Sequence, residues 1–121
     1  MQNFRELRVW QRSHQLALSI YHVTAEFPKH ELYGLTSQMR RSATSVPTNI
    51  AEGCGRNSSA ELARFLQIAM GSASELEYQL LLAHDLNLLS KPQHTQLETE
   101  LIEIKRMLNS FLQKLRAKTN H

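Results

Sequence analysis

The chain has 121 residues, a net charge of +3 and a sequence pI of about 9.3. This length suits one domain with a single core, the lone cysteine excludes an internal disulfide, and no apolar run is long enough to cross a membrane. Few Gly, Pro and aromatic residues, with Leu, Ala and Ile dominating the apolar set, favour an all-α protein, which we expect in the reducing cytoplasm.

The first predicted helix spans about residues 6–27. Apolar and small residues repeat there at alternating spacings of four and three, which keeps them on one helical face. They are Val9, Ser13, Leu16, Ile20, Val23 and Phe27. The following Pro28 marks the end of the helix, because the residue before a proline disfavours the helical conformation.

The second predicted helix spans about residues 35–53 and is unusual because Pro47 lies near its centre. Its stripe has the same spacing and comprises Leu35, Met39, Ser42, Val46, Ile50 and Gly53. A proline inside a helix removes one backbone hydrogen bond, so we expect a kink at Pro47.

The third and fourth predicted helices span about residues 59–88 and 91–117. Ser58 with Glu61 has the spacing of a helix N-cap, and Pro92 stands in the first turn of the fourth helix, where its missing N–H costs nothing. All three connections are short, so consecutive helices should be antiparallel neighbours. The sequence therefore predicts an up-down-up-down four-helix bundle.

Small and polar residues interrupt the apolar faces of the second and third helices. A buried Asn or Glu needs a partner, and we expect a polar network that joins Asn49 and Glu52 to Ser72 or Glu75. Packing within a subunit or across an interface is the favoured reading, and a ligand or catalytic pocket is the alternative. Two further cations, Arg40 and Arg41, could pair with acids across an interface or line a channel.

Residues for catalysis or metal binding are poorly represented. The acids lack the Glu-x-x-His pairs of metal-binding bundles, and His22 with Glu26 or His94 with Glu98 has i, i+4 spacing that ordinary surface pairs also show. Cys54 stands between two glycines, where it could be accessible, but no base is indicated. We expect no enzyme activity, no metal and no cofactor.

The basic residues are segregated along the chain. In an up-down-up-down bundle one end collects the start of the first helix, the end of the second, the start of the third and the end of the fourth. Against Glu6, Glu52 and Glu61, that end gathers eight cations, a local excess of five: Arg5, Arg8, Arg12, Arg56, Arg64, Lys114, Arg116 and Lys118. A basic end of this kind suits a phosphate backbone, and an acidic protein partner is the alternative.

Several stretches together resemble one family. They are Phe4, Leu7, Val9, Trp10 and Gln11; Tyr21 to Pro28; Glu31 to Arg41; Ser45 to Gly53; Arg64 to Leu66; and Ile68-Ala69 with Gly71 to Glu77. In these the chain resembles the four-helix-bundle proteins encoded in intervening sequences of bacterial 23S ribosomal RNA genes. The resemblance implies a cyclic homo-oligomer, a pentamer, and kinship with the accessory variability determinant of diversity-generating retroelements, which binds nucleic acid and a reverse transcriptase. It implies no enzyme activity, and the expected partners are other copies of the chain and RNA or an RNA–protein complex.

Overall fold

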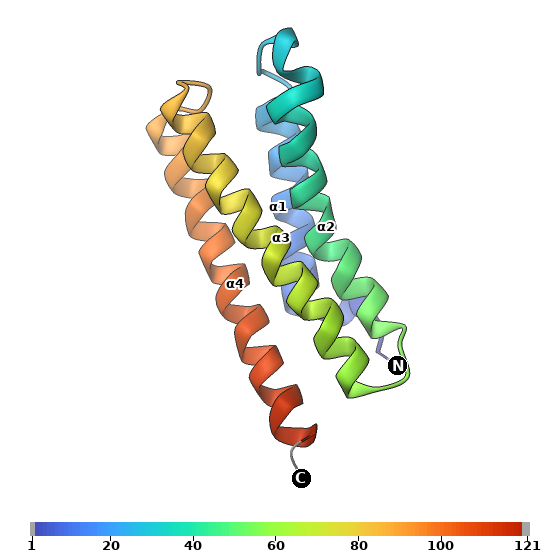
Figure 1. Ribbon diagram of the computed structural model, residues 1–121. Helices are drawn as coiled ribbons and strands as arrows, with labels where there is room; N and C mark the ends of the chain where they lie inside the picture. Colours follow the sequence, from blue (N-terminus) through green and yellow to red (C-terminus); the bar gives the residue numbers. More distant parts are fainter. Residues whose placement is uncertain (1, 120–121) are drawn as a thin grey trace.

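Four long α-helices account for most of residues 2–119, the part of the chain that the computed structural model describes (Figure 1). They are α1 (Arg8–Thr24), α2 (Ser37–Cys54), α3 (Ser59–Asp85) and α4 (Lys91–Thr119). Consecutive helices run in opposite directions, and α1 also packs against α4, which closes the bundle. The predicted all-α, up-down-up-down fold is confirmed.

The core consists of the apolar stripes that the spacing predicted. Each helix turns its stripe inward, because burying apolar surface supplies most of the stability of a bundle. The side chains that are completely shielded from solvent include Ile20 of α1, Met39 and Ile50 of α2, Leu66, Leu76 and Leu80 of α3, and Leu101, Ile104 and Leu108 of α4.

The first helix is shorter than predicted at both ends. A separate 3₁₀ turn, η1 (Phe4–Glu6), precedes it, and Leu7 is extended, so α1 begins only at Arg8. At the other end, the hydroxyl of Thr24 donates to the Ile20 carbonyl oxygen at 2.6 Å, and the Phe27 N–H bonds to the Thr24 carbonyl at 3.0 Å. This tighter turn replaces the last predicted helical residues.

The connection from α1 to α2 is more structured than the sequence suggests. A 3₁₀ turn, η2 (Lys29–Glu31), leads into a π-helical turn, η3 (Leu32–Thr36), in which Gly34 leaves helical geometry with φ −114° and ψ −111°. The α-helix starts at Ser37, two residues later than predicted. It then continues without a break past Pro47, whose ring is buried, and the bend at Pro47 stays a prediction.

The connection from α3 to α4 begins with a compact C-terminal cap on α3. Asn87 adopts a left-handed conformation with φ 62°, and the Leu88 N–H donates to the Ala83 carbonyl oxygen at 2.8 Å. This is the Schellman arrangement that satisfies free carbonyls at a helix end. The helix α3 therefore ends at Asp85, three residues before the predicted end, whereas α4 runs two residues beyond its predicted end at 117.

Candidate nucleic-acid interface

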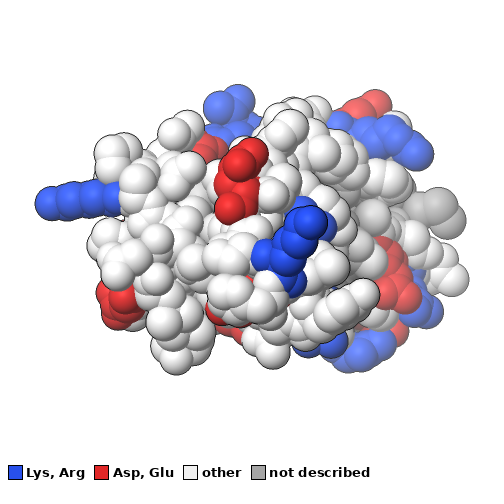
Figure 2. Space-filling model, turned by 90° about the horizontal axis from the view of Figure 1, so that it is seen from above, with Lys and Arg blue, Asp and Glu red and all other residues white. Residues whose placement is uncertain are grey.

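The antiparallel arrangement places the predicted basic residues at one end of the bundle. The N-terminal segment, the end of α2, the start of α3 and the end of α4 meet there, and the Gln2 N–H donates to the Cys54 carbonyl oxygen at 3.2 Å (Figure 1). We call this end the basic pole; the cations assigned to it are Arg5, Arg8, Arg12, Arg56, Arg64, Lys114, Arg116 and Lys118. The opposite end, viewed in Figure 2, carries scattered charged side chains of both signs separated by uncharged surface.

Three cations of the basic pole are held by acids of the same chain. Arg12 reaches across to Glu100 of α4 at 3.1 Å, and Arg56 and Arg64 lie 3.4 and 3.1 Å from Glu52 and Glu61. The hydrogen bond from Arg64 also holds the pKa of Glu61 below its ordinary value, so this acid is ionised at neutral pH. These partners cancel much of the charge that the three arginines would offer to a phosphate.

The ring of Phe65 links two of these arginines. The guanidinium carbons of Arg56 and Arg64 lie 4.8 and 4.6 Å from its centroid, at distances typical of cation–π contacts. The two ion pairs and the shared ring tie the end of α2 to the first turns of α3. The first role of this cluster is therefore structural: it stabilises the connection between the two helices.

Other cations of the pole are less constrained. Arg8, Lys114 and Lys118 are exposed and have no ion pair with another of residues 2–119, while the guanidinium carbon of Arg5 lies 4.5 Å from the Phe4 ring centroid. A cation that is not held in an internal ion pair is available to an external partner. The structure thus separates cations that the sequence treated alike.

One basic residue near this surface was missed by the sequence analysis. Arg106 of α4 forms a forked pair with Glu103, with N–O distances of 2.6 and 2.8 Å from one guanidinium nitrogen and 3.0 Å from Nε. The hydrogen bond from Arg106 lowers the pKa of Glu103, and the charges of Arg12 and Arg8 add to the effect. The i, i+3 spacing of Glu103 and Arg106 was the available signal.

The predicted polar network is partly present. The Asn49 amide donates to the Ser45 carbonyl at 2.8 Å and to its hydroxyl at 3.0 Å, and that hydroxyl lies 2.8 Å from the Ser72 hydroxyl. Asn49 therefore reaches α3 through Ser45. The expectation that Glu52 joins the same network within the chain is wrong, because its carboxylate is exposed beside Arg56.

A second link between α2 and α3 lies on the same side. The buried Ser42 hydroxyl donates to the Glu75 carboxylate at 3.0 Å, so Glu75 is bonded to α2 although much of its side chain is exposed. Both links lie within one chain and use short side chains of α2. The polar residues on the inner side of α2 therefore serve to hold α2 against α3.

The two arginines of α2 have different surroundings. Arg40 lies over the Tyr21 ring with its guanidinium carbon 4.6 Å from the centroid, and its Nε donates to the Thr24 hydroxyl at 2.9 Å. Arg41 is exposed, and within residues 2–119 it has no acidic partner. Arg40 thus helps to join α1 and α2, and Arg41 remains available to a partner.

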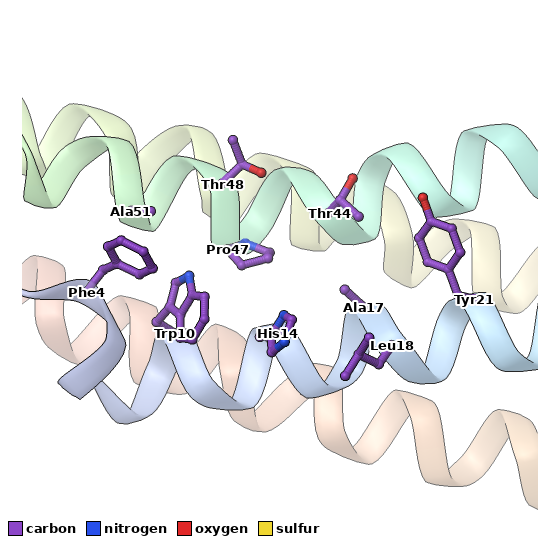
Figure 3. A pocket seen from close by; sticks show the side chains of 10 residues that line it. All are labelled: Phe4, Trp10, His14, Ala17, Leu18, Tyr21, Thr44, Pro47, Thr48 and Ala51. Carbon is purple, nitrogen blue, oxygen red and sulfur yellow. The ribbon is translucent and has the colours of Figure 1, made fainter.

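An apolar groove of about 440 Å³ runs along the seam of α1 and α2. Figure 3 shows the rings of Phe4, Trp10 and His14 in line, facing Pro47 and Ala51 of α2. The Trp10 and His14 rings stack at 5.0 Å, and Phe4 meets Trp10 edge-on at 4.9 Å. We call this feature the α1/α2 groove.

The α1/α2 groove continues toward the opposite end of the bundle. Tyr21 and Thr44 also line a second hollow, which includes Arg41 and the side chains of Leu32 and Tyr33. Tyr33 is 94% exposed, an unusual position for a large aromatic residue. The seam is thus an extended, partly aromatic surface with cations at one end.

Residues suited to chemistry are not assembled in the described part of the chain. Within residues 2–119 no three His, Cys, Asp or Glu side chains lie close enough to hold a metal ion. His94 stacks on His84 at 4.8 Å, and its Nε2 lies 3.7 Å from a Glu98 oxygen. The helices described here also lack a segment apolar and long enough to span a bilayer.

Cys54, which the sequence left as a thiol that could be accessible, is buried. Cys54 lies inside the last turn of α2 rather than beyond it, and only 2% of its surface is exposed. Burial disfavours the thiolate and raises the pKa of the thiol above its ordinary value. Both effects lower its reactivity, because the thiolate is the nucleophile.

We therefore predict that a water-soluble disulfide reagent labels Cys54 slowly in the folded protein and rapidly in denaturant. The native labelling rate should follow the rate of unfolding, which is measured in parallel by loss of circular dichroism. The unfolded chain at the same pH supplies the intrinsic rate for comparison. Native labelling as fast as that of the unfolded chain would show that the thiol is not shielded.

Comparison with known proteins identifies the family. The model of the 23S rRNA-intervening sequence protein family matches residues 5–110. A crystal structure of a protein of unknown function from the S23 ribosomal protein family of Bacteroides thetaiotaomicron VPI-5482 is similar, with a TM-score of 0.78 and 27% sequence identity over 86% of this chain and 97% of that one. No curated protein matches the sequence. Because the family model spans most of the chain, the protein belongs to the 23S rRNA-intervening sequence protein family.

Proposed function

We propose that the protein is a non-enzymatic, homo-oligomeric bundle that binds RNA, alone or in an RNA–protein complex, through its basic pole in the cytoplasm. The proposal that the protein binds RNA rests on one observation, which is that cations from four separate segments lie together at one end of the bundle. Three of them, Arg8, Lys114 and Lys118, are exposed and have no ion pair within the described residues. The family match to proteins named for a ribosomal RNA insertion supports the same partner.

The RNA proposal is tested by titrating a structured fragment of 23S ribosomal RNA with the protein at two salt concentrations. Binding through phosphate contacts should weaken steeply with salt, because each contact releases counterions. Absent or salt-insensitive binding by a well-folded protein would refute the proposal. If instead a cellular partner remains bound after nuclease treatment, the pole contacts an acidic protein, which is the alternative from the sequence.

The homo-oligomer is supported by the surface of the first two helices. The helix α1 contains no acidic residue, and α2 contains only Glu52 near its end. The α1/α2 groove presents Trp10 and Tyr21, and the adjoining hollow presents Arg41. Trp, Tyr and Arg are the residue types that most often dominate binding at protein interfaces. Covering an apolar, acid-free surface of this kind with a protein partner is more favourable than leaving it exposed to water.

The opposite face of the same chain has complementary properties. The helices α3 and α4 carry seven of the eleven acidic residues, among them the exposed Glu75. The outer side of α3 also exposes Ile68, Tyr78 and Leu81, by 41%, 61% and 46%. We therefore infer that the α1/α2 groove of one copy receives the outer face of α3 of the next. Head-to-tail contacts form a ring when the rotation between neighbouring copies closes, and a closed ring is the arrangement expected of the pentamer that the family resemblance implies.

This assembly is tested with two neighbouring residues of α1. Leu18 lines the α1/α2 groove and is 43% exposed, whereas Ser19 is exposed outside it. A buried, unpaired carboxylate costs far more than an exposed one. Leu18→Glu should therefore reduce the mass in sedimentation equilibrium to that of one chain, and Ser19→Glu should leave it unchanged. A monomeric wild-type protein, or equal masses for both variants and wild type, would overturn the assignment.

A further inference from the structure

A further hollow, separate from those between α1 and α2, lies at the basic pole where the first turn of α1 meets α4. It has a volume of about 280 Å³, and the half-buried side chains of Leu7, Met107 and Phe111 form its floor. We call it the seam pocket. Pockets for drug-sized ligands begin near about 300 Å³, so this one suits a single small ring system rather than an extended chain.

Cations from both helices surround this apolar floor. Arg8 of α1 and Arg106 and Lys114 of α4 line the seam pocket, together with the hydroxyl-bearing Ser110. Arg106 is occupied by its forked pair with Glu103. Neither Arg8 nor Lys114 forms an ion pair within residues 2–119, although the charge of Arg8 acts through space on Glu103, so these two cations supply the net positive charge of the rim.

The combination of floor and rim specifies the chemistry of a ligand. It should have a flat or apolar part that lies on Met107 and Phe111, and an anionic part that reaches Arg8 and Lys114. A nucleotide joins such parts within one residue of an RNA strand. In a duplex the bases are stacked and paired, so only an unpaired nucleotide can place its base on a protein side chain.

We propose that the seam pocket binds one unpaired nucleotide of an RNA strand, with its base on the floor formed by Met107 and Phe111 and its phosphate between Arg8 and Lys114. This inference rests on the proposed RNA-binding function and gives it a definite site. The pocket lies on the α1 and α4 side, away from the α1/α2 groove. The proposed assembly therefore leaves one open seam pocket in each copy.

Two exposed lysines at the opposite end of the bundle, Lys29 and Lys91, provide a matched control, because neither forms an ion pair within residues 2–119. The double variant Arg8→Ala with Lys114→Ala and the double variant Lys29→Ala with Lys91→Ala each remove two positive charges from the protein. A direct phosphate contact is lost only in the first, which should weaken binding of a short single-stranded RNA by about tenfold or more and reduce the salt slope by about two. The second should change the affinity by less than about threefold, since its two lysines lie at the end of the bundle opposite the basic pole.

A third variant tests the base. Phe111→Leu keeps an apolar side chain of similar size but removes the aromatic face. Stacking of one base on an aromatic residue contributes about 1–3 kcal/mol, so single-stranded RNA should bind about fivefold more weakly or worse, while blunt duplex RNA should bind as before. Thermal melting of all variants by circular dichroism verifies that they fold.

The possible outcomes separate the two proposals. If the wild-type protein binds no RNA, the proposed function itself fails. If it binds RNA but the two double variants weaken binding equally, the function stands and the seam pocket is not its site. If Arg8 and Lys114 matter but Phe111→Leu affects single strands and duplex alike, the pocket contacts phosphate only, and capture of an unpaired nucleotide is refuted.

Discussion

Leu101→Ala is expected to lower the free energy of unfolding by about 2–5 kcal/mol, the range for truncating a large buried side chain. Leu101 lies on the inner face of α4 and is completely shielded from solvent. The substitution removes apolar contacts and leaves a cavity that neighbouring helices fill only in part. Denaturant unfolding at one fixed protein concentration gives the value, because assembly would otherwise change the apparent stability.

The adjacent residue is the control for this experiment. Ile102 differs from Leu101 by one position in the chain but is 50% exposed. Ile102→Ala removes a similar volume from the surface of the same helix, and the change in stability should stay within about 0.5 kcal/mol. If both substitutions cost the same, the assignment of the inner face of α4 is incorrect.

Identical substitutions at two glycines should have opposite effects on stability. A Cβ at Gly53 would lie 2.9 Å from both Leu62 Cδ1 and Phe65 Cβ, which is closer than carbon atoms pack. Gly53→Ala should therefore destabilise the fold by about 1–3 kcal/mol, the usual cost of overpacking. A Cβ at Gly71 meets nothing within 4 Å in the single chain. In the Leu18→Glu background, in which the outer face of α3 should be uncovered, Gly71→Ala should therefore stabilise α3 by about 0.5–1 kcal/mol through its higher helix propensity.

Thermal and denaturant unfolding of both glycine variants would measure this contrast. Gly53→Ala as stable as the wild type would mean that α2 and α3 can separate at their connection without cost. Gly71→Ala less stable than its Leu18→Glu parent would contradict the open space beside Gly71. Without Leu18→Glu the proposed assembly covers this face, so Gly71→Ala in the wild-type background should alter the mass of the assembly.

Helix interiors were predictable because burial requires a fixed period. Leu97, Leu101, Ile104 and Leu108 repeat at four and three residues, and all four are buried. Toward the end of α4, however, Leu112 is buried while Phe111 is only half-buried. Alternating steps of four and three residues average about 3.5, whereas an α-helix has about 3.6 residues per turn. A stripe with this spacing therefore drifts slowly around a long helix, away from the buried face.

Helix ends were harder to predict because they depend on local backbone geometry. Asn87 ends α3 in a left-handed conformation, a position for which glycine is the stronger signal, and so the apolar run to Leu88 suggested three more helical residues. The π-helical turn before α2 likewise has no distinctive pattern. Its only marker is Gly34, which departs from helical geometry in the middle of that turn.

The candidate site was predictable in position but not in its charge balance. Helix direction alone places Arg56 and Lys114 at the same end of the bundle. The pair of Arg12 with Glu100, by contrast, joins residues that are 88 positions apart, and it forms only because α1 packs beside α4. Which cations stay free is therefore a property of the folded chain.

The stacked rings in the α1/α2 groove have a practical consequence. Trp10 is the only tryptophan of the chain, and it lies in that groove against His14. Its fluorescence therefore comes from a single, known place, and a neighbouring chain that covers the groove would exclude water from the indole. RNA held at the α1 and α4 seam would leave the indole uncovered. The protein thus carries a built-in optical probe that can distinguish self-assembly from RNA binding without any label.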